Sequence, residues 1–213
     1  MSDKSTNADL VMIGGGGHAL SLLEIDRVNW KGYLSPSPSQ EMPLPWLGDD
    51  SQAPLLANEG ALFHMAFVYA GLPVMSKRAK LIEFYKENGA QFASVIAPSA
   101  IITPHSHIER GCAVMQRVLL NRCHIGENSI INSGAIIEHD SSIGSNTFIG
   151  PGAVIGGFTS VGNNCFIGLG ALLKNGIRIA DGVSVAMGAK IDRDLLEPGI
   201  YHGSPLRLFR HKF

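Results

Sequence analysis

The sequence predicts an α/β unit over residues 1–95, followed by an all-β parallel β-helix with a C-terminal cap over residues 96–213. Two patterns support this prediction. A short apolar run at Leu10–Ile13 ends in a glycine-rich turn, which is typical of a strand–turn–helix unit. From Ile125 to Ile191 an aliphatic residue returns at every sixth position, a period that matches neither an α-helix nor a β-hairpin.

The composition excludes several classes of partner. The chain has 213 residues, 16% of them charged, a formal net charge of −1 and no block of basic residues, so we expect no nucleic-acid partner. The longest apolar runs, such as residues 66–72, are too short for membrane insertion, and the N-terminus is polar. The three cysteines lack the spacing of a metal site. We therefore expect a cytoplasmic protein without a metal.

The segment before the repeat has the pattern of alternating strands and helices. Ser76 is a good N-cap, and the apolar spacing after it predicts a helix through Lys86 that ends before Gly89. The segment has room for about four strands, which suits one bound nucleotide better than a dinucleotide. We expect these strands at Leu10–Ile13 and at residues 31–34, 66–70 and 92–95, with another helix at residues 19–28.

The turn after the first strand, Gly14-x-Gly16-x-x-Ala19, fits the Gly-x-Gly-x-x-Ala form of nucleotide-binding loops. Such a turn lets backbone N–H groups approach phosphate oxygens at the positive end of a helix. The motif alone is weak, because a purely structural turn needs the same glycines.

The hexapeptide repeat predicts which residues face inward. A small residue, such as Ser129 or Cys165, stands four places after most of the periodic aliphatic residues. The first and fifth residues of each hexapeptide are therefore expected inside a prism of stacked coils, with the others outside or at the turns.

The stretch that joins the two units keeps the period of six but is one residue out of register with Ile125. A five-residue step or a loop near residues 116–122 must absorb this slip, and we expect the prism to begin near Ile101. Histidines and cysteines gather here at spacings that fit no common metal site, so we expect them at outward positions of the early coils. They are His105, His107, Cys112, Cys123 and His124.

The run Ile137-Glu138-His139-Asp140, the repeat around it and the glycine-rich N-terminal segment together resemble the NeuD/PglD-like acetyltransferases. These enzymes N-acetylate nucleotide sugars or O-acetylate sialic acid. The resemblance implies a left-handed β-helix with three hexapeptides in each coil, a Rossmann-like half domain before it, and a homotrimer with active sites between subunits. It also implies acetyl-CoA as co-substrate and a nucleotide-diphosphate amino sugar as acceptor.

The resemblance also implies roles for named residues. His139 matches the general base, and Asp140 matches the acid that assists it. Ser35-Pro36 departs from the family pattern, which has an acidic pair there, and Phe148 stands where relatives often have a second histidine. Residues matched to substrate binding are Gly16, Gly17, His18 and Gly71, and those assigned to coenzyme binding are Phe148, Gly157, Leu169, Gly170, Met187 and Gly188.

The place of His139 in its hexapeptide supports this role, although a lone outward histidine is usually a surface residue. It is the third residue of six, so its side chain stands outside the prism, and successive coils lie about 4.8 Å apart. The residue one coil above is Gly157, which leaves room for a ligand. The flanking carboxylates of Glu138 and Asp140 raise the basicity of the imidazole.

Two apolar columns are expected outside the prism. One contains Pro151, Leu169 and Met187, and beside it Phe148 stacks on Phe166 one coil later. Exposed apolar columns mark a subunit interface or a ligand groove.

The leading hypothesis is direct transfer of an acetyl group to the amine of a nucleotide-linked 4-amino-4,6-dideoxy sugar. His139 removes the proton of the amine, Asp140 holds the ring, and a backbone N–H near Gly157 stabilises the oxyanion. No cysteine is well placed as a nucleophile. O-acetylation of sialic acid or a related sugar needs the same base and is the alternative, and a non-catalytic β-helix scaffold is a third hypothesis.

Overall fold

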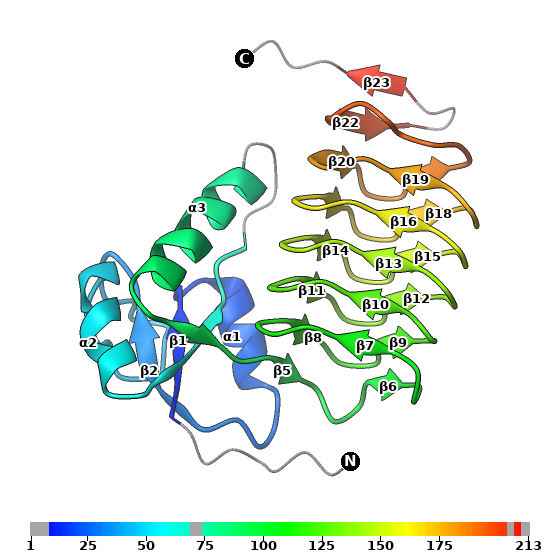
Figure 1. Cartoon of the computed structure of the whole chain (residues 1–213). Helices are drawn as coiled ribbons and strands as arrows, with labels where there is room; N and C mark the ends of the chain where they lie inside the picture. The colour runs from blue at the N-terminus through cyan, green and yellow to red at the C-terminus, as the bar shows by residue number, and fades with distance from the viewer. Residues whose placement is uncertain (1–8, 69–73, 204–206, 210–213) are drawn as a thin grey trace.

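The computed structural model describes residues 9–68, 74–203 and 207–209, which form two units side by side (Figure 1). The first unit is a parallel sheet in the order β2-β1-β3-β4. Helix α1 packs on one face of the sheet, and α2 and α3 pack on the other. The elements are β1 Leu10–Ile13, α1 Gly17–Leu23, β2 Trp30–Leu34, the 3-10 helix Asp50–Gln52, α2 Ala53–Asn58, β3 Leu62–Met65, α3 Val74–Glu87 and β4 Gln91–Phe92.

Four predicted boundaries in this unit are wrong, among them that of the strand expected at residues 92–95, since β4 ends at Phe92. β3 ends at Met65, just before Ala66, where the sequence predicts a strand to begin, because its partner β1 ends at Ile13 and is followed by Gly14 with φ +106°. α1 stops before residue 28, since Arg27 adopts the left-handed φ of +70°. α3 begins before Ser76, which is therefore not its N-cap.

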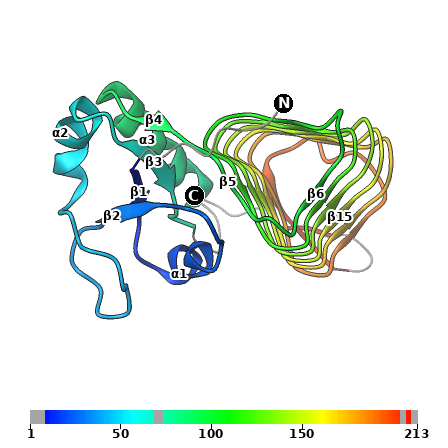
Figure 2. The ribbon, with the colours of Figure 1, turned by 90° about the horizontal axis from the view of Figure 1, so that it is seen from below.

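The second unit is a triangular prism of short parallel strands, seen along its axis in Figure 2. Each regular strand pairs with the strand 18 residues later, as Ile130 does with Phe148 and Ile136 with Val154. This register confirms the coil of three hexapeptides. The inward aliphatic residues form one continuous buried core.

The prism has three faces, named here by their strands. The first face contains β5 Val95–Ile96, β8 Ala113–Val114, β11 Ile130–Ile131, β14 Phe148–Ile149, β17 Phe166–Ile167, β20 Val183–Val185, β22 Gly199–His202 and β23 Arg207–Phe209. The second face contains β6 Ile101–Ile102, β9 Leu119–Leu120, β12 Ile136–Ile137, β15 Val154–Ile155, β18 Leu172–Leu173 and β21 Lys190–Ile191. The third face contains β7 His107–Ile108, β10 His124–Ile125, β13 Ser142–Ile143, β16 Ser160–Val161 and β19 Arg178–Ile179.

The early coils differ from the prediction in where they begin. Val95 of β5 already pairs with β8, so the prism starts before Ile101. The predicted five-residue step is confirmed, because β9 and β10 place Leu120 and Ile125 at equivalent inward positions. The sheet of the first unit ends at Phe92, and the predicted division of the chain between residues 95 and 96 stays a prediction.

The cysteines lie inside the prism. Cys112 and Cys123 are buried and not outward as predicted, because each occupies the small inward position of its hexapeptide. Cys165 is buried, as the sequence predicts. The pKa of the Cys112 thiol is raised to about 12 and that of Cys165 to about 11, in both cases mainly by burial. These thiols therefore stay protonated at neutral pH.

The first face of the prism packs against α1, as both views show (Figures 1 and 2). Ala19 and Leu22 of α1 join one buried cluster with Met115, Ile130 and Phe148 of the prism. In the parts of the chain that the structure describes, no helix has the length and apolarity needed to cross a bilayer.

Arg78 of α3 links the two units through a buried guanidinium group. Its side chain is 1% exposed and donates to the carbonyl oxygens of Phe67 at 2.9 Å and Asn128 at 2.7 Å. It also donates to the side-chain oxygen of Asn146. Since Asn128 and Asn146 lie at the turns between the third and first faces, α3 is held against that edge of the prism.

Candidate active site

His139 lies at the turn between β12 and β13, where the second and third faces meet. Its side chain is 48% exposed, as expected for an outward position. Nδ1 lies 3.1 Å from Oδ2 of Asp140, and Oδ1 of Asp140 accepts a hydrogen bond from Nε of Arg122 at 3.0 Å. The turn itself holds Asp140 in place, because this residue adopts a left-handed φ of +58°.

The hydrogen bonds that link Arg122, Asp140 and His139 determine which nitrogen of the imidazole carries the proton. The hydrogen bond from His139 is the main cause that holds the pKa of Asp140 below its usual range, and Arg122 contributes to the same shift. The ionised carboxylate of Asp140 accepts a hydrogen bond from the N–H at Nδ1 of the neutral ring. Nε2 is then unprotonated and can accept a proton. This arrangement suits a general base.

Gly157 lies directly against the free nitrogen of the imidazole. A Cβ on Gly157 would stand 2.9 Å from Nε2 of His139 and 3.1 Å from its carbonyl oxygen, so the space exists because the residue is glycine. The N–H of Gly157 has no hydrogen-bond acceptor among the described residues. Nε2 of His139 therefore lies against backbone that carries no side chain, and the same residue offers an unused N–H, so both a base and an oxyanion donor are available here.

Two residues that contact this turn, Arg122 and Phe158, are not among the predicted site residues. Both stand one coil from Asp140, and Phe158 makes an edge contact with the ring of His139, with centroids 5.1 Å apart. The same counting by coils that places Gly157 above His139 could have found them. Glu138, by contrast, does not assist the imidazole as expected, since its carboxylate accepts a hydrogen bond from the side chain of Asn121 at 3.0 Å.

Two of the residues assigned to coenzyme binding form an exposed apolar stripe. Leu169 is 55% exposed and Met187 is 76% exposed, one coil apart, so the predicted column is present. Gly170 and Gly188 follow them with φ of +64° and +65° in left-handed turns. The four residues lie where the first and second faces meet, so the width of the second face separates them from His139 within one chain.

Phe148 does not lie on an open face. It stacks on Phe166 as expected, with ring centroids 4.9 Å apart and planes at 6°. However, it is 8% exposed, because the first face on which both rings stand is covered by α1. The structure therefore gives Phe148 a packing role between the two units.

The predicted phosphate loop lies on the first-face side of the prism, at the start of α1. Gly16 and Gly17 are exposed, whereas Nε2 of His18 is buried without a hydrogen-bond partner among the described residues. The pKa of His18 is lowered to about 3, mainly by burial and then by His64 and Arg78. Gly71, the fourth residue assigned to substrate binding, lies outside the described residues.

The glycine loop and His139 are on opposite sides of one chain. Helix α1 covers the first face, and His139 stands at the turn opposite that face, between the second and third faces (Figure 2).

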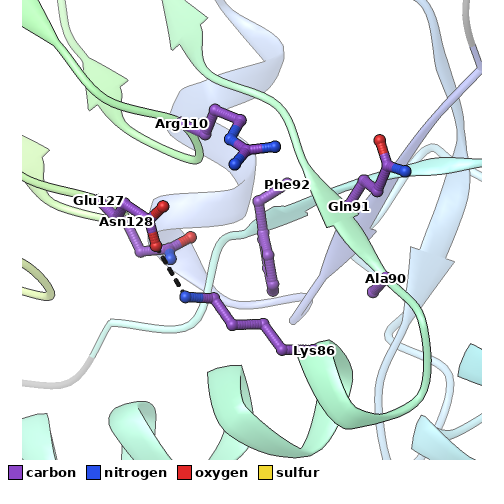
Figure 3. Close-up of a pocket in the computed structure, with 7 residues that line it drawn as sticks. All are labelled: Lys86, Ala90, Gln91, Phe92, Arg110, Glu127 and Asn128. Carbon is purple, nitrogen blue, oxygen red and sulfur yellow. Dashed lines mark hydrogen bonds and ion pairs between the residues drawn. The ribbon is translucent and has the colours of Figure 1, made fainter.

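Two cavities lie on the prism, one beside the turn of His139 and one beside α3. One, of about 550 Å³, adjoins the turn of His139, and it is called here the histidine pocket; it is lined by His105, His107, Arg122, His124, Asp140 and Ser142, among others. The other, of about 340 Å³, lies between α3 and the prism, with Lys86 paired to Glu127 at 2.7 Å and Arg110 at its edge (Figure 3). None of the predicted site residues line this second cavity.

No group of three His, Cys, Asp or Glu side chains in the described part of the chain has the arrangement of a metal site.

Two family models of hexapeptide repeats match the prism. The family model "Bacterial transferase hexapeptide (six repeats)" matches residues 122–157, and "Hexapeptide repeat of succinyl-transferase" matches residues 158–193. No curated protein matches the sequence significantly.

Solved structures match the chain along nearly its full length. PerB from Caulobacter crescentus, in complex with CoA and GDP-perosamine, is 30% identical with a TM-score of 0.86 over 96% of this chain and 99% of its own. A histidine-to-alanine mutant of GDP-perosamine N-acetyltransferase from the same organism is 29% identical with a TM-score of 0.88, over 97% and 99%. The acetyltransferase domain of PglB from Neisseria gonorrhoeae, at 24% identity with a TM-score of 0.83 over 95% and 100%, shares the fold.

Proposed function

The chain belongs to the PerB-like family of left-handed β-helix, hexapeptide-repeat nucleotide-sugar acetyltransferases, and from that premise we propose that it acetylates the amine of a nucleotide-linked 4-amino-4,6-dideoxy sugar. As a member of this family it is an acetyl-CoA-dependent acetyltransferase. The observation that supports the proposal is the geometry at His139, whose Nδ1 contacts Asp140 while its Nε2 lies against the bare backbone of Gly157.

The proposed reaction is a direct transfer in one complex. The amine attacks the thioester carbonyl of acetyl-CoA while Nε2 of His139 takes a proton from it. Asp140 stabilises the imidazolium that forms, and Arg122 holds Asp140 in position. The N–H of Gly157 stabilises the tetrahedral oxyanion. The carbon–sulfur bond then breaks, and the thiolate of CoA accepts the proton from the imidazolium, so His139 returns to its neutral form.

We further propose a homotrimer with the active site between subunits. An aliphatic column runs along the outside of the second face, and its ends are open to solvent, with Ile101 63% and Leu172 43% exposed. A second copy of this chain is the natural cover for such a column. The rest of the column is Leu119, Ile136 and Val154.

This assembly brings together residues that one chain keeps apart. His139 and the Leu169–Met187 stripe lie at the two edges of the second face, so contact between second faces places the stripe of one subunit near the base of another. We propose that this seam, with Gly157, Gly170 and Gly188, holds acetyl-CoA. A neighbouring loop containing Gly16, Gly17 and His18, with Gly71, holds the nucleotide diphosphate of the acceptor.

The test is a panel of UDP-, GDP- and dTDP-linked 4-amino-4,6-dideoxy sugars, with free sialic acid included, monitored by release of free CoA thiol. We expect acetylation of one of the nucleotide sugars. His139→Ala should lose about 10²- to 10⁴-fold in kcat while the melting temperature stays unchanged. A response to sialic acid alone would assign the enzyme to O-acetylation. An unaffected rate in His139→Ala would refute the assigned base.

A further inference from the structure

Apart from Arg122 and Asp140, the residues that line the histidine pocket have no part in the mechanism above. We propose that it binds the diphosphate of the acceptor, so that the β-helix of one subunit contributes imidazole and guanidinium donors to a substrate otherwise held by the neighbouring loop. This inference rests on the proposed function, because it names the phosphates of that acceptor as the ligand.

Two stacked imidazoles form one wall of the pocket. His107 of β7 pairs in register with His124 of β10, and their rings stack with centroids 5.9 Å apart and planes at 16°. His105, in the turn before β7, is also exposed and lines the same cavity. Three imidazoles thus line an open cavity of about 550 Å³, which is large enough for a diphosphate.

The pocket contains more free hydrogen-bond donors than free acceptors. The ring nitrogens of His105 and His107 have no hydrogen-bond partner in the described residues. Arg122 uses Nε to hold Asp140, which leaves the N–H groups of its two terminal nitrogens available.

Both carboxylates near these groups are already engaged. Asp140 accepts from His139 and Arg122, and Glu109 contacts Nε2 of His124 at 3.0 Å and accepts from the backbone N–H of Glu127. Unused N–H donors around an open cavity match the many acceptor oxygens of a phosphate.

The position of the pocket indicates which substrate it serves. On the C-terminal side the next coil presents Gly157 against His139 and the exposed apolar ring of Phe158 beside it. On the N-terminal side, by contrast, Arg122 stacks on Asp140, next to the imidazoles. Bare backbone suits the long uncharged arm of a thioester, and the donor-rich side suits the charged acceptor. Asp140 contacts the ring of His139 and also lines the pocket, so a diphosphate bound there lies beside the residue that orients the base.

The test is the double variant His105→Ala/His107→Ala, which removes the two imidazoles with unused ring nitrogens and leaves the hydrogen bonds among Arg122, Asp140 and His139 intact. We expect KM for the nucleotide sugar to rise roughly tenfold for each imidazole that binds phosphate, with kcat within about threefold and KM for acetyl-CoA unchanged. His107→Ala alone, which removes one exposed ring, should show a smaller rise. Arg178→Gln, a charge removed from the far end of the same face, is the matched control and should leave both KM values unchanged.

Measuring nucleotide affinity directly distinguishes a failure of the pocket assignment from a failure of the proposed function. Calorimetric titration with GDP, UDP, dTDP and CoA should show weaker binding of one nucleoside diphosphate to the double variant and equal binding of CoA. If no nucleotide sugar is acetylated but this difference persists, the proposed function fails and the pocket assignment stands. Equal affinity for the diphosphates, a raised KM for acetyl-CoA or dissociation of the oligomer in gel filtration would overturn the assignment.

Discussion

Replacing Gly157 by alanine tests the geometry of the site with one methyl group. The backbone accommodates the change, because the φ of Gly157 is not in the left-handed region. The new Cβ, however, would stand 2.9 Å from Nε2 and 3.0 Å from Cε1 of His139, against about 3.4 Å for an ordinary contact. The ring must therefore retreat by about 0.5 Å, and the methyl group covers the nitrogen that accepts the proton.

We expect the Gly157→Ala substitution to lower kcat and to leave the fold intact. A misplacement of about 1 Å at a reacting group costs about 10²-fold, so half that shift together with a covered Nε2 should lower kcat by about 10- to 100-fold. The ring of His139 is exposed at its outer edge and can rotate outward. The melting temperature should consequently fall by no more than about 4 °C, equivalent to about 1 kcal/mol in a protein of this size.

The assay is thiol release at saturating acetyl-CoA, with thermal unfolding measured on the same samples. Ser160→Ala, an exposed residue in the same coil, is the control and should keep kcat within about twofold. The double variant His139→Ala/Gly157→Ala should be no slower than His139→Ala, because the two residues act as one unit. Wild-type kcat in Gly157→Ala would show that Nε2 does not face the reacting atoms.

Three further predictions concern Asp140 and the buried groups between the two units. Asp140→Asn should lower kcat by roughly 10- to 100-fold and move the acid limb of the pH–rate profile to lower pH, since a carboxylate that stabilises imidazolium is lost; an unmoved limb would contradict this role. The free energy of unfolding should fall as the pH drops from 6.5 to about 4, because the unfolded chain protonates His64 while burial lowers its folded pKa to about 4. His64→Gln should flatten this decline in urea titrations at several pH values, and an equally steep decline would assign it to other groups. Arg78→Ala should cost about 3 kcal/mol or more in urea unfolding, because buried acceptors lose their donor; a cost below about 1 kcal/mol would mean that water replaces the guanidinium group.

The repeat and the environment of His139 were accessible from the sequence to a large extent. A hexapeptide period is a local pattern, so counting by coils correctly placed His139 outside the prism with Gly157 beside it. The same counting would have identified Arg122 and Phe158 one coil from Asp140. The boundaries of β3 and α1 were not accessible in this way, since they depend on where a neighbouring strand ends and on the left-handed conformation of Arg27.

The sequence by itself determined the coil, the inward positions and the stacking of Gly157 on His139, because residues at a constant spacing in a regular helix must lie above one another. The tertiary structure alone decided which carboxylate orients the imidazole, since Glu138 turns to Asn121 while the left-handed turn aims Asp140 at the ring. It also decided that Phe148 is covered by α1 and that the glycine loop lies across the prism from His139. These outcomes depend on packing between segments far apart in the chain, which no local period specifies.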